Sequence, residues 1–251
     1  MKKCLKYSVL RYSPSTITGE RINLGIVVYD ELLDLREFRY TKKFKRLSSF
    51  DDEIDINTIK LILQDIREDL SVTLLSEEHL DVEDYIKFYN NDLHFDSPKQ
   101  IEYDDFDETI DSLFKIYFRF DYEKKDRPDK TADVKLLEEL IKAKSIEYKK
   151  NQPVVGEFDE NIRYDLVTPE HNIKVFDFDG KDLSKVINTA KVWAFNAMTS
   201  KEIDKLIYIY RYSDELKNSN PDFDSIKKIF DASKVKFCNF EDGIQEISRI
   251  S

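Results

Sequence analysis

Acids and lysines on two neighbouring segments are the residues of this chain whose types and spacing best suit chemistry. Asp165 lies in the segment RYDLV, and the next segment, IKVFDFDGK, carries Lys174, Asp177, Asp179 and Lys181. Carboxylates that gather in one place can hold Mg²⁺ against a phosphate, while a lysine orients water or offsets charge. The same acids also suit strand ends and a helix N-terminus, where free N–H groups favour negative charge. Two interpretations therefore stay open, a metal-dependent site and ordinary capping chemistry.

Hydrophobic periodicity predicts the elements that would position these residues. In chain order it predicts a helix, an extended segment, two strands, a helix, a strand, a helix and a final strand, over residues 131–143, 145–158, 161–168, 172–179, 181–198, 205–212, 221–232 and 234–240. Thr131 is the expected N-cap of the first helix, and Pro221 suits the start of the last one. Asp165 and Asp177 would then lie on two strands joined by a short turn.

This α-β-β-β-α-β order resembles the core of the restriction-endonuclease-like, or PD-(D/E)xK, superfamily. In that superfamily the second strand supplies an Asp, and the third supplies an acid followed two positions later by Lys. Asp165 and Asp177 match the two acids, but Asp179 stands where the Lys is required. The catalytic residues that the resemblance implies are Asp165, Asp177, Lys174 and Lys181, the implied Mg²⁺ ligands are Asp165, Asp177 and Asp179, and a further carboxylate would come from Glu138 or Glu139. Because the motif is incomplete, a degenerate noncatalytic site stays open beside a working nuclease.

The first half of the chain begins with a pattern of strands. Residues 5–12, 21–30 and 34–40 are rich in β-forming residues. Gly25, in the middle of the second strand, predicts a bulge or a close approach of two backbones. A basic helix or turn is expected at residues 41–50, and helices are expected within residues 55–70, 81–90 and 107–120. A polar network that fixes the loop between the first two strands is expected from Arg11, Glu20, Arg21 and Asn23.

The opening strands resemble a bacterial domain family of unknown function. Its members begin with a Tyr-Ser-Val-Ile-Arg-Tyr strand, a loop that ends in Gly-Glu, and an Asn-Val-Gly-Val-Val strand. This chain has YSVLRY at residues 7–12, Gly19 followed by Glu20, and NLGIV at residues 23–27. The resemblance implies no activity, because the family has none established. Such proteins resemble those encoded in phage, prophage or defence loci.

Composition and length predict an α+β protein of two domains. The chain has 251 residues, of which 41% are apolar and 36% charged, and this is enough apolar material for a core. The charged segment at residues 121–130, broken by Pro128, is the best candidate for a linker. We therefore predict domains at residues 1–122 and 123–251, with an antiparallel sheet and helices in the first and a mixed sheet in the second.

Charge is distributed unevenly along the chain. Residues 1–50 carry 11 Lys and Arg against 5 acids, whereas residues 51–111 carry 4 Lys and Arg against 20 acids. An acidic field of this strength steers basic partners and disfavours casual binding to nucleic acid, although it also suits any soluble surface. The acidic stretch at residues 101–111 could imitate a nucleic-acid backbone towards a basic nucleic-acid-binding protein.

A basic stretch interleaved with aromatic residues stands out in the first fifty residues. Its cations are Arg39, Lys42, Lys43, Lys45 and Arg46. Such a pattern can hold a phosphate backbone, so we name these residues as a candidate binding site. A soluble helix beside an acidic neighbour would look the same.

The remaining sequence features narrow the class of protein. There is no Gly-rich phosphate loop, nucleophile elbow, secretory signal or apolar run long enough for a membrane span. Cys4 and Cys238 are expected to be reduced thiols in a cytoplasmic protein. The leading hypothesis is a noncatalytic protein without a cofactor that binds a protein or nucleic acid in phage–host or mobile-element conflict, in defence or anti-defence. The alternative is a Mg²⁺-dependent nuclease of the PD-(D/E)xK type.

Overall fold

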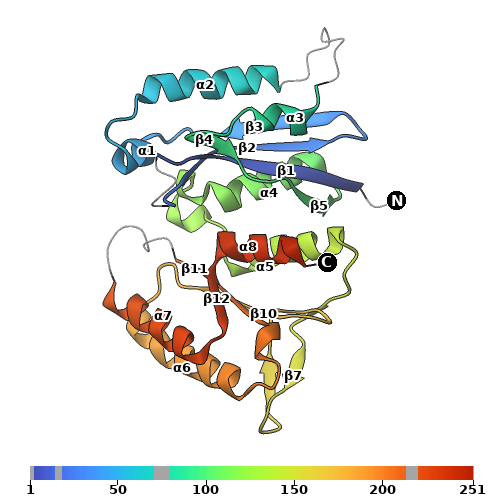
Figure 1. Ribbon diagram of the computed structural model, residues 1–251, viewed down its shortest axis with the longest axis vertical. Coiled ribbons are helices and arrows are strands. Elements are labelled where there is room, and N and C mark those ends of the chain that lie inside the picture. Colours follow the sequence, from blue (N-terminus) through green and yellow to red (C-terminus); the bar gives the residue numbers. More distant parts are fainter. Residues whose placement is uncertain (1–2, 15–18, 71–79, 213–219, 251) are drawn as a thin grey trace. The chain divides into compact units, whose positions relative to one another are not determined.

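The protein is an α+β chain built from two sheet-containing units, as predicted. The computed structural model describes residues 3–14, 19–70, 80–212 and 220–250. The chain divides into compact units at Met1–Pro128 and Asp129–Ser251. The first unit holds an antiparallel sheet with helices, and the second holds a mixed sheet with helices (Figure 1).

The first unit is organised around its first strand. The elements of this unit are β1 (Lys3–Tyr12), β2 (Ile22–Asp30), β3 (Leu35–Tyr40), α1 (Lys45–Phe50), α2 (Ile56–Asp69), α3 (Val82–Lys87), β4 (Leu93–Phe95), β5 (Lys99–Tyr103), α4 (Phe106–Tyr117) and the short 3-10 turns η1 (Arg119–Asp121) and η2 (Lys124–Asp126). The strand order is β3-β2-β1-β4, and β5 also pairs with β1. One edge of β1 therefore carries β2, while its other edge is shared by β4 and β5.

Gly25 lies beside a bulge, which is one of the two roles that its position in the strand predicted, and a side-chain ring packs closely against it. The register between β1 and β2 shifts at Leu10 and Arg11, which face Gly25 and Asn23. A Cβ atom on Gly25 would lie 2.3 Å from the ring of Phe38 on β3. Only glycine therefore lets this ring lie against the bulge. Of the connection between β1 and β2, residues 15–18 lie outside the described part of the chain.

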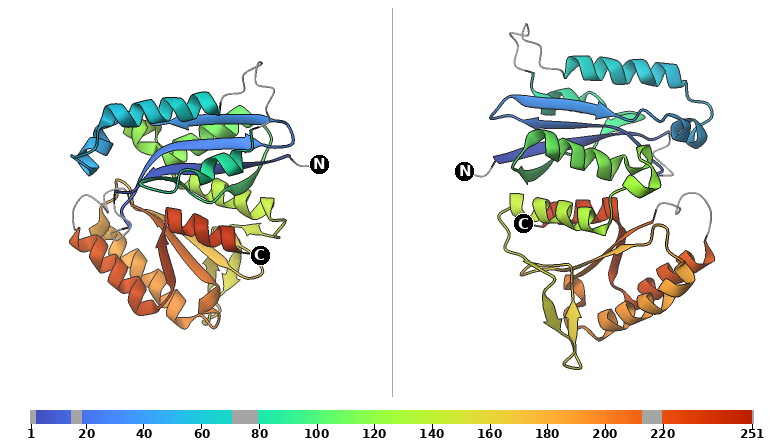
Figure 2. Two further views of the ribbon diagram at one scale, coloured as in Figure 1. Left: turned by 45° about the horizontal axis from the view of Figure 1, so that its top comes forward. Right: turned by 180° about the vertical axis from the view of Figure 1, so that it is seen from behind.

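Helices cover both faces of the first sheet. The helices α2 and α3 lie over one face and α4 lies over the other, as Figure 1 and the view from behind in Figure 2 both show. Asp55 caps α2 by accepting a hydrogen bond from the backbone N–H of Asn57. The predicted apolar face of α2 buries Ile59, Leu63 and Ile66, and each such side chain contributes about 1.5–3 kcal/mol when fully buried.

The second unit contains a five-stranded mixed sheet. The elements of this unit are α5 (Lys130–Ala143), β6 (Lys149–Lys150), β7 (Pro153–Val155), β8 (Asn161–Arg163), β9 (Leu166–Val167), β10 (Asn172–Asp177), α6 (Leu183–Thr199), the 3-10 turn η3 (Ile203–Lys205), β11 (Leu206–Arg211), α7 (Pro221–Ser233), β12 (Lys236–Asn239) and α8 (Phe240–Arg249). The strand order is β12-β11-β10-β9-β6, while β7 and β8 form a separate hairpin. The strands β10, β11 and β12 are parallel, and β9 is antiparallel to β10.

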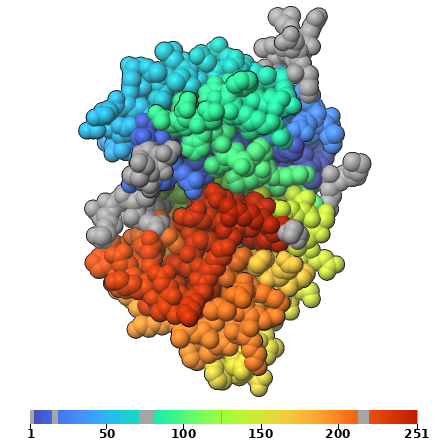
Figure 3. Space-filling model, viewed as in Figure 1, coloured from blue at the N-terminus to red at the C-terminus, as the bar shows by residue number. Residues whose placement is uncertain are grey.

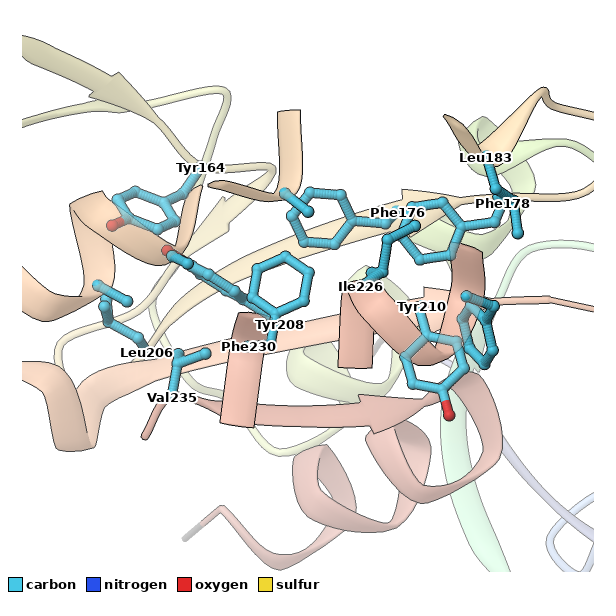
Figure 4. Packing of buried hydrophobic residues seen from close by; sticks show 14 of the residues in the cluster. Tyr164, Phe176, Phe178, Leu183, Leu206, Tyr208, Tyr210, Ile226, Phe230 and Val235 are labelled. Atoms are coloured by element: carbon cyan, nitrogen blue, oxygen red, sulfur yellow. The ribbon is translucent and has the colours of Figure 1, made fainter. Parts of the chain in front are cut away.

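Two pairs of helices enclose this sheet. The helices α6 and α7, which connect the parallel strands, cover one face, and α5 and α8 cover the other (Figure 1). In the space-filling view, α7 and α8 lie at the visible surface of this unit (Figure 3). The core under α6 and α7 is aromatic (Figure 4). Its centre is Phe176, whose ring centroid lies 5.6–5.8 Å from those of Trp193, Tyr208 and Phe230.

Some boundaries and elements differ from the sequence-based prediction. The N-cap of α5 is Asp129 rather than Thr131, because the Asp129 carboxylate accepts hydrogen bonds from the backbone N–H groups of Thr131 and Ala132. The strands β4 and β5 and the helix α8 are additions to the predicted set. Pro221 occupies the first turn of α7, as predicted. None of the helices among the described residues is long and apolar enough to span a membrane.

Candidate functional site

Asp165 lies where β9 begins, beside β10. Its backbone N–H donates to the carbonyl of Ile173 at 2.9 Å. Its carboxylate Oδ2 accepts a hydrogen bond from the backbone N–H of Val175 at 2.8 Å. The residue is buried, with 8% of its surface exposed. The sheet itself therefore fixes this carboxylate at the position where the nuclease resemblance expects an acid.

Two lysines hold the Asp165 carboxylate from different elements. Lys130, the first residue of α5, places its Nζ 2.7 Å from Oδ1, and Lys174 on β10 places its Nζ 3.7 Å from Oδ2. Lys174 also donates to the carbonyl of Arg163 at 3.1 Å and lies 4.5 Å from the centroid of the Trp193 ring. Burial lowers the pKa of Lys174, with a smaller lowering from Lys130, while the Asp165 carboxylate acts in the opposite direction. The cluster holds one carboxylate against two ammonium groups.

The other predicted site residues lie at the end of β10 and in the turn after it. Asp177 ends β10, and its carboxylate accepts a hydrogen bond from the backbone N–H of Asp179 at 3.1 Å. Side chains alternate between the two faces of a strand, so Lys174 and Asp177, three positions apart, belong to opposite faces of the sheet. Lys181 is exposed in the turn before α6. The structure thus brings Lys174 to Asp165, but it does not bring Lys174 and Asp177 to one face.

This donor set does not fit a Mg²⁺ ion well. Mg²⁺ takes carboxylate oxygens in near-ideal octahedral geometry, whereas the oxygens of Asp165 already face two ammonium groups and a backbone N–H. Throughout the part of the chain that the structure describes, no group of three or more His, Cys, Asp or Glu side chains could hold a metal ion. The geometry is that of a closed ion-pair cluster.

Glu138, the candidate for a further carboxylate, belongs to a separate cluster. It is buried on α5 and accepts from Lys142 at 2.9 Å, from Lys150 on β6 and from the Tyr148 hydroxyl. Burial acts to raise the pKa of Glu138, but these three donors together lower it to about 2. Glu139 is half-buried, and its carboxylate lies 3.8 Å from the ammonium of the exposed Lys135. Both side chains therefore have structural partners.

A further buried ion pair lies at the carboxyl ends of the parallel strands. Arg211, which pairs with Asp177 in the register of β10 and β11, donates from Nε to Asp133 of α5 at 2.6 Å. Asp133 is fully buried, and the Arg211 guanidinium lies 4.1 Å from the centroid of the Phe240 ring. Neither residue was predicted as part of a site. The only sequence signal is a charged residue on the inward face of an amphipathic helix.

The predicted basic stretch separates into engaged and exposed cations. Arg39 donates from Nε to Glu37 at 2.6 Å and also pairs with Asp111. The guanidinium of Arg46 lies 4.3 Å from the centroid of the Phe120 ring. Arg46 nevertheless remains exposed on the surface, as do Lys42, Lys43 and Lys45. The structure therefore offers four cations, rather than five, to a phosphate backbone.

Arg11, a member of the expected loop network, forms a buried ion pair with a residue outside that network. Arg11 has 2% of its side chain exposed, and its Nη2 lies 2.7 Å from Oδ2 of Asp96, in the connection between β4 and β5. Asn23 donates its side-chain amide to the carbonyl of Tyr117 at 3.3 Å. Glu20 is exposed, and its backbone carbonyl accepts from the Ser13 hydroxyl. The conspicuous Arg11 therefore serves the pairing of β1 with distant strands.

The comparisons with known proteins identify only the first part of the chain. Residues 7–118 match the family described as Protein of unknown function (DUF3037). The matched range runs from β1 to the end of α4, so it confirms the resemblance of the opening strands to a domain family of unknown function. No match was found among curated proteins or among solved structures.

Proposed function

We propose that the protein is a noncatalytic binding protein whose first unit contacts a basic protein partner, with its nuclease-like second unit as a scaffold. The observation that carries this proposal is that the Asp165 carboxylate is already paired with two cations. The Nζ atoms of Lys130 and Lys174 lie 2.7 and 3.7 Å from its oxygens. A catalytic carboxylate must be able to bind metal or move protons, and this one is already neutralised by two cations. The cluster is better suited to hold α5, β9 and β10 together.

The surface of the first unit supplies the binding side of the proposal. Residues 51–111 carry 20 acids against 4 Lys and Arg. At the start of α4, Asp104, Asp107 and Glu108 are exposed, while Asp105 caps the helix by accepting from the N–H of Glu108. Such a single-sign surface raises the rate of encounter with a basic partner and makes binding depend on salt.

The proposed biological setting rests on the resemblance of the opening strands. We place the binding activity in the cytoplasm, in conflict between bacteria and phage or other mobile elements, as either defence or anti-defence. Cys4 and Cys238 are both free thiols, which agrees with a reducing compartment. A basic nucleic-acid-binding protein is the partner class that the acidic surface fits best, because such proteins carry complementary charge.

A nuclease assay separates this proposal from its rival, a Mg²⁺-dependent nuclease that uses Asp165, Asp177 and a lysine. The full chain is incubated with plasmid and with single-stranded DNA in Mg²⁺ or Mn²⁺, beside Asp165→Ala and a matched control, Asp231→Ala, on the exposed side of α7. We expect no cleavage by any of the three. Cleavage that Asp165→Ala abolishes and Asp231→Ala retains would overturn the noncatalytic proposal.

A binding assay tests the acidic surface directly. A bacterial lysate is passed over the immobilised full chain at low and at high salt, and the retained proteins are identified by mass spectrometry. We expect a basic protein that is lost at high salt and lost when the exposed acids at α4 are neutralised, as Asp104→Asn, Asp107→Asn and Glu108→Gln. A control with the same change in net charge neutralises exposed acids of the second unit, as Asp204→Asn, Asp224→Asn and Asp231→Asn. Equal retention by both variants would refute the assignment of the surface.

A further inference from the structure

A cavity in the first unit contains a buried cation that lacks a hydrogen-bond partner. The cavity has a volume of about 400 Å³ and lies between one end of the sheet and the start of α3. Arg36 of β3 lines it with only 6% of its side chain exposed. Among the described residues, the Nε of Arg36 has no hydrogen-bond partner. Its Nη1 lies 3.6 Å from Asp34, which is too long for a hydrogen bond.

The pairing of the strands explains why Arg36 faces this cavity. Tyr29 of β2 is opposite Arg36 on β3 and opposite Lys6 on β1. Residues directly opposite each other in a sheet point to the same face, so Lys6, Tyr29 and Arg36 form a row across three strands. All three line the cavity. The row therefore presents an ammonium, a phenol and a guanidinium on one wall.

The other cations of the cavity are satisfied, and Arg36 differs from them. Lys6 lies 2.6 Å from Glu83 of α3 and 3.1 Å from Glu31. Lys87 lies 2.7 Å from Asp84. Among the described residues, Arg36 has only the longer ion pair with Asp34 at 3.6 Å, and burial of a charge whose partners are few is costly because its hydration is lost. Arg36 therefore has the binding capacity for an oxyanion, and a carboxylate matches the planar fork of its donors.

The charge of the rest of the lining restricts the kind of anion. Six carboxylates and three cationic side chains surround the cavity. An anion that carried no positive group would gain at Arg36 but would be repelled by this excess of acids. A ligand with a carboxylate and an ammonium group meets both demands, because its ammonium can share the carboxylates of Glu31 and Glu83, which have the single ammonium of Lys6 between them. The cavity volume also lies in the range of small-molecule sites, about 300–1,000 Å³.

We propose that this cavity binds a small zwitterionic ligand of the amino-acid class, with its carboxylate on Arg36 and its ammonium towards Glu31 and Glu83. The site is independent of the partner-binding surface at α4. Failure of one proposal therefore leaves the other standing.

The test measures the binding of free amino acids to the full chain. Each proteinogenic L-amino acid is screened at millimolar concentration by thermal shift, and the best one is titrated by calorimetry. We expect at least one of them to raise the melting temperature, because a ligand that binds only the folded state stabilises it. Its amide, which lacks the carboxylate, and its N-acetyl derivative, which lacks the ammonium, should each bind at least about tenfold more weakly.

Variants of the full chain locate the site. Arg36→Gln should weaken binding by at least about tenfold, whereas Arg39→Gln, the same change on the same strand outside the cavity, should leave it unchanged. If Arg36→Gln does not fold, the proposal is tested on the unmodified chain, by comparing the affinity of the amino acid with the affinities of its amide and its N-acetyl derivative. The proposal is overturned if no amino acid binds, if either derivative binds as tightly as its parent, or if folded Arg36→Gln retains full affinity.

Discussion

The buried pair of Arg11 and Asp96 should carry a large part of the stability of the first unit. The side chains are 2% and 10% exposed, and Nη2 and Oδ2 lie 2.7 Å apart. Arg11→Met keeps the aliphatic stem but leaves Asp96 as a buried carboxylate. Removing one partner of a buried pair costs about 3–5 kcal/mol. Lys99, whose Nζ lies 3.5 Å from Oδ2 of Asp96, retains some compensation, so we expect the lower end, about 3 kcal/mol.

The pH dependence of this loss provides an independent check. Burial acts to raise the pKa of Asp96, but the charges of Arg11 and Lys99 outweigh it and hold the pKa below its ordinary value. The ion pair therefore stabilises the folded state above the ordinary Asp pKa, and this contribution disappears as pH falls through the lowered pKa. The difference in stability between the native chain and Arg11→Met should shrink as the solution is acidified below the ordinary Asp pKa of about 4.

The measurement must report on each unit separately, because a chain with two units need not unfold in one step. The chain has a single tryptophan, Trp193, which lies in the second unit. Its fluorescence follows the second unit during urea unfolding, while hydrogen exchange of the β1 and β2 amides follows the first. We expect the variant to increase exchange in β1 and β2 and to leave the Trp193 transition unchanged.

A matched variant distinguishes burial from charge. Arg39→Met removes an arginine that pairs with Glu37 and Asp111 at the surface, and exposed pairs are worth about 0–1 kcal/mol. A loss for Arg11→Met below about 1 kcal/mol, or a loss that does not change on acidification, would refute the reasoning.

Two further predictions concern close packing and thiol chemistry. Gly25→Ala should destabilise the first unit by about 1–3 kcal/mol, because its Cβ would meet the Phe38 ring at 2.3 Å; unchanged exchange in β2 would contradict this. Burial, with nearby acids, raises the pKa of the Cys238 thiol to about 12, so at pH near 8 Ellman's reagent should label it about a thousandfold more slowly in the folded chain than in urea. Equal rates, measured in Cys4→Ser to isolate Cys238, would contradict this second prediction.

Local patterns in the sequence were sufficient for most helices and for the main strands. Helix α2 was predicted from neighbouring residues alone, namely the apolar spacing of Ile59, Leu63 and Ile66 and the N-cap at Asp55. A glycine within a strand, Gly25, likewise predicted the bulge that lies beside it. The helix α8 begins immediately after β12, without an intervening turn. Asn239 ends the strand and also caps the helix by accepting a hydrogen bond from the N–H of Asp242, so the start of α8 is hidden in a segment that was predicted as a strand.

The candidate sites depend on contacts that a sequence does not display. Arg11 meets Asp96 and Asp133 meets Arg211 across long stretches of chain, and strand pairing selects these partners. The single strand predicted over residues 161–168 is divided into β8 and β9, and Asp165 lies in the bend between them. Its neutralisation by Lys130 also required the placement of α5. The sequence around Arg36 gave no signal of a site. Arg36 lines the cavity only because the pairing of β1, β2 and β3 places it beside Tyr29 and Lys6.

The central position of β1 has a consequence for the synthesis of the protein. β1 is made before every other described strand, but β5, which covers one of its edges, follows only after residues 13–98 have been added. At about 5–20 residues per second, a ribosome needs roughly 4–17 s for that stretch. During this time the open edge can pair with another nascent chain, a risk that Lys3 and Lys6 on this strand reduce. The rate of translation through residues 13–98 therefore sets how long the newborn chain is vulnerable to aggregation.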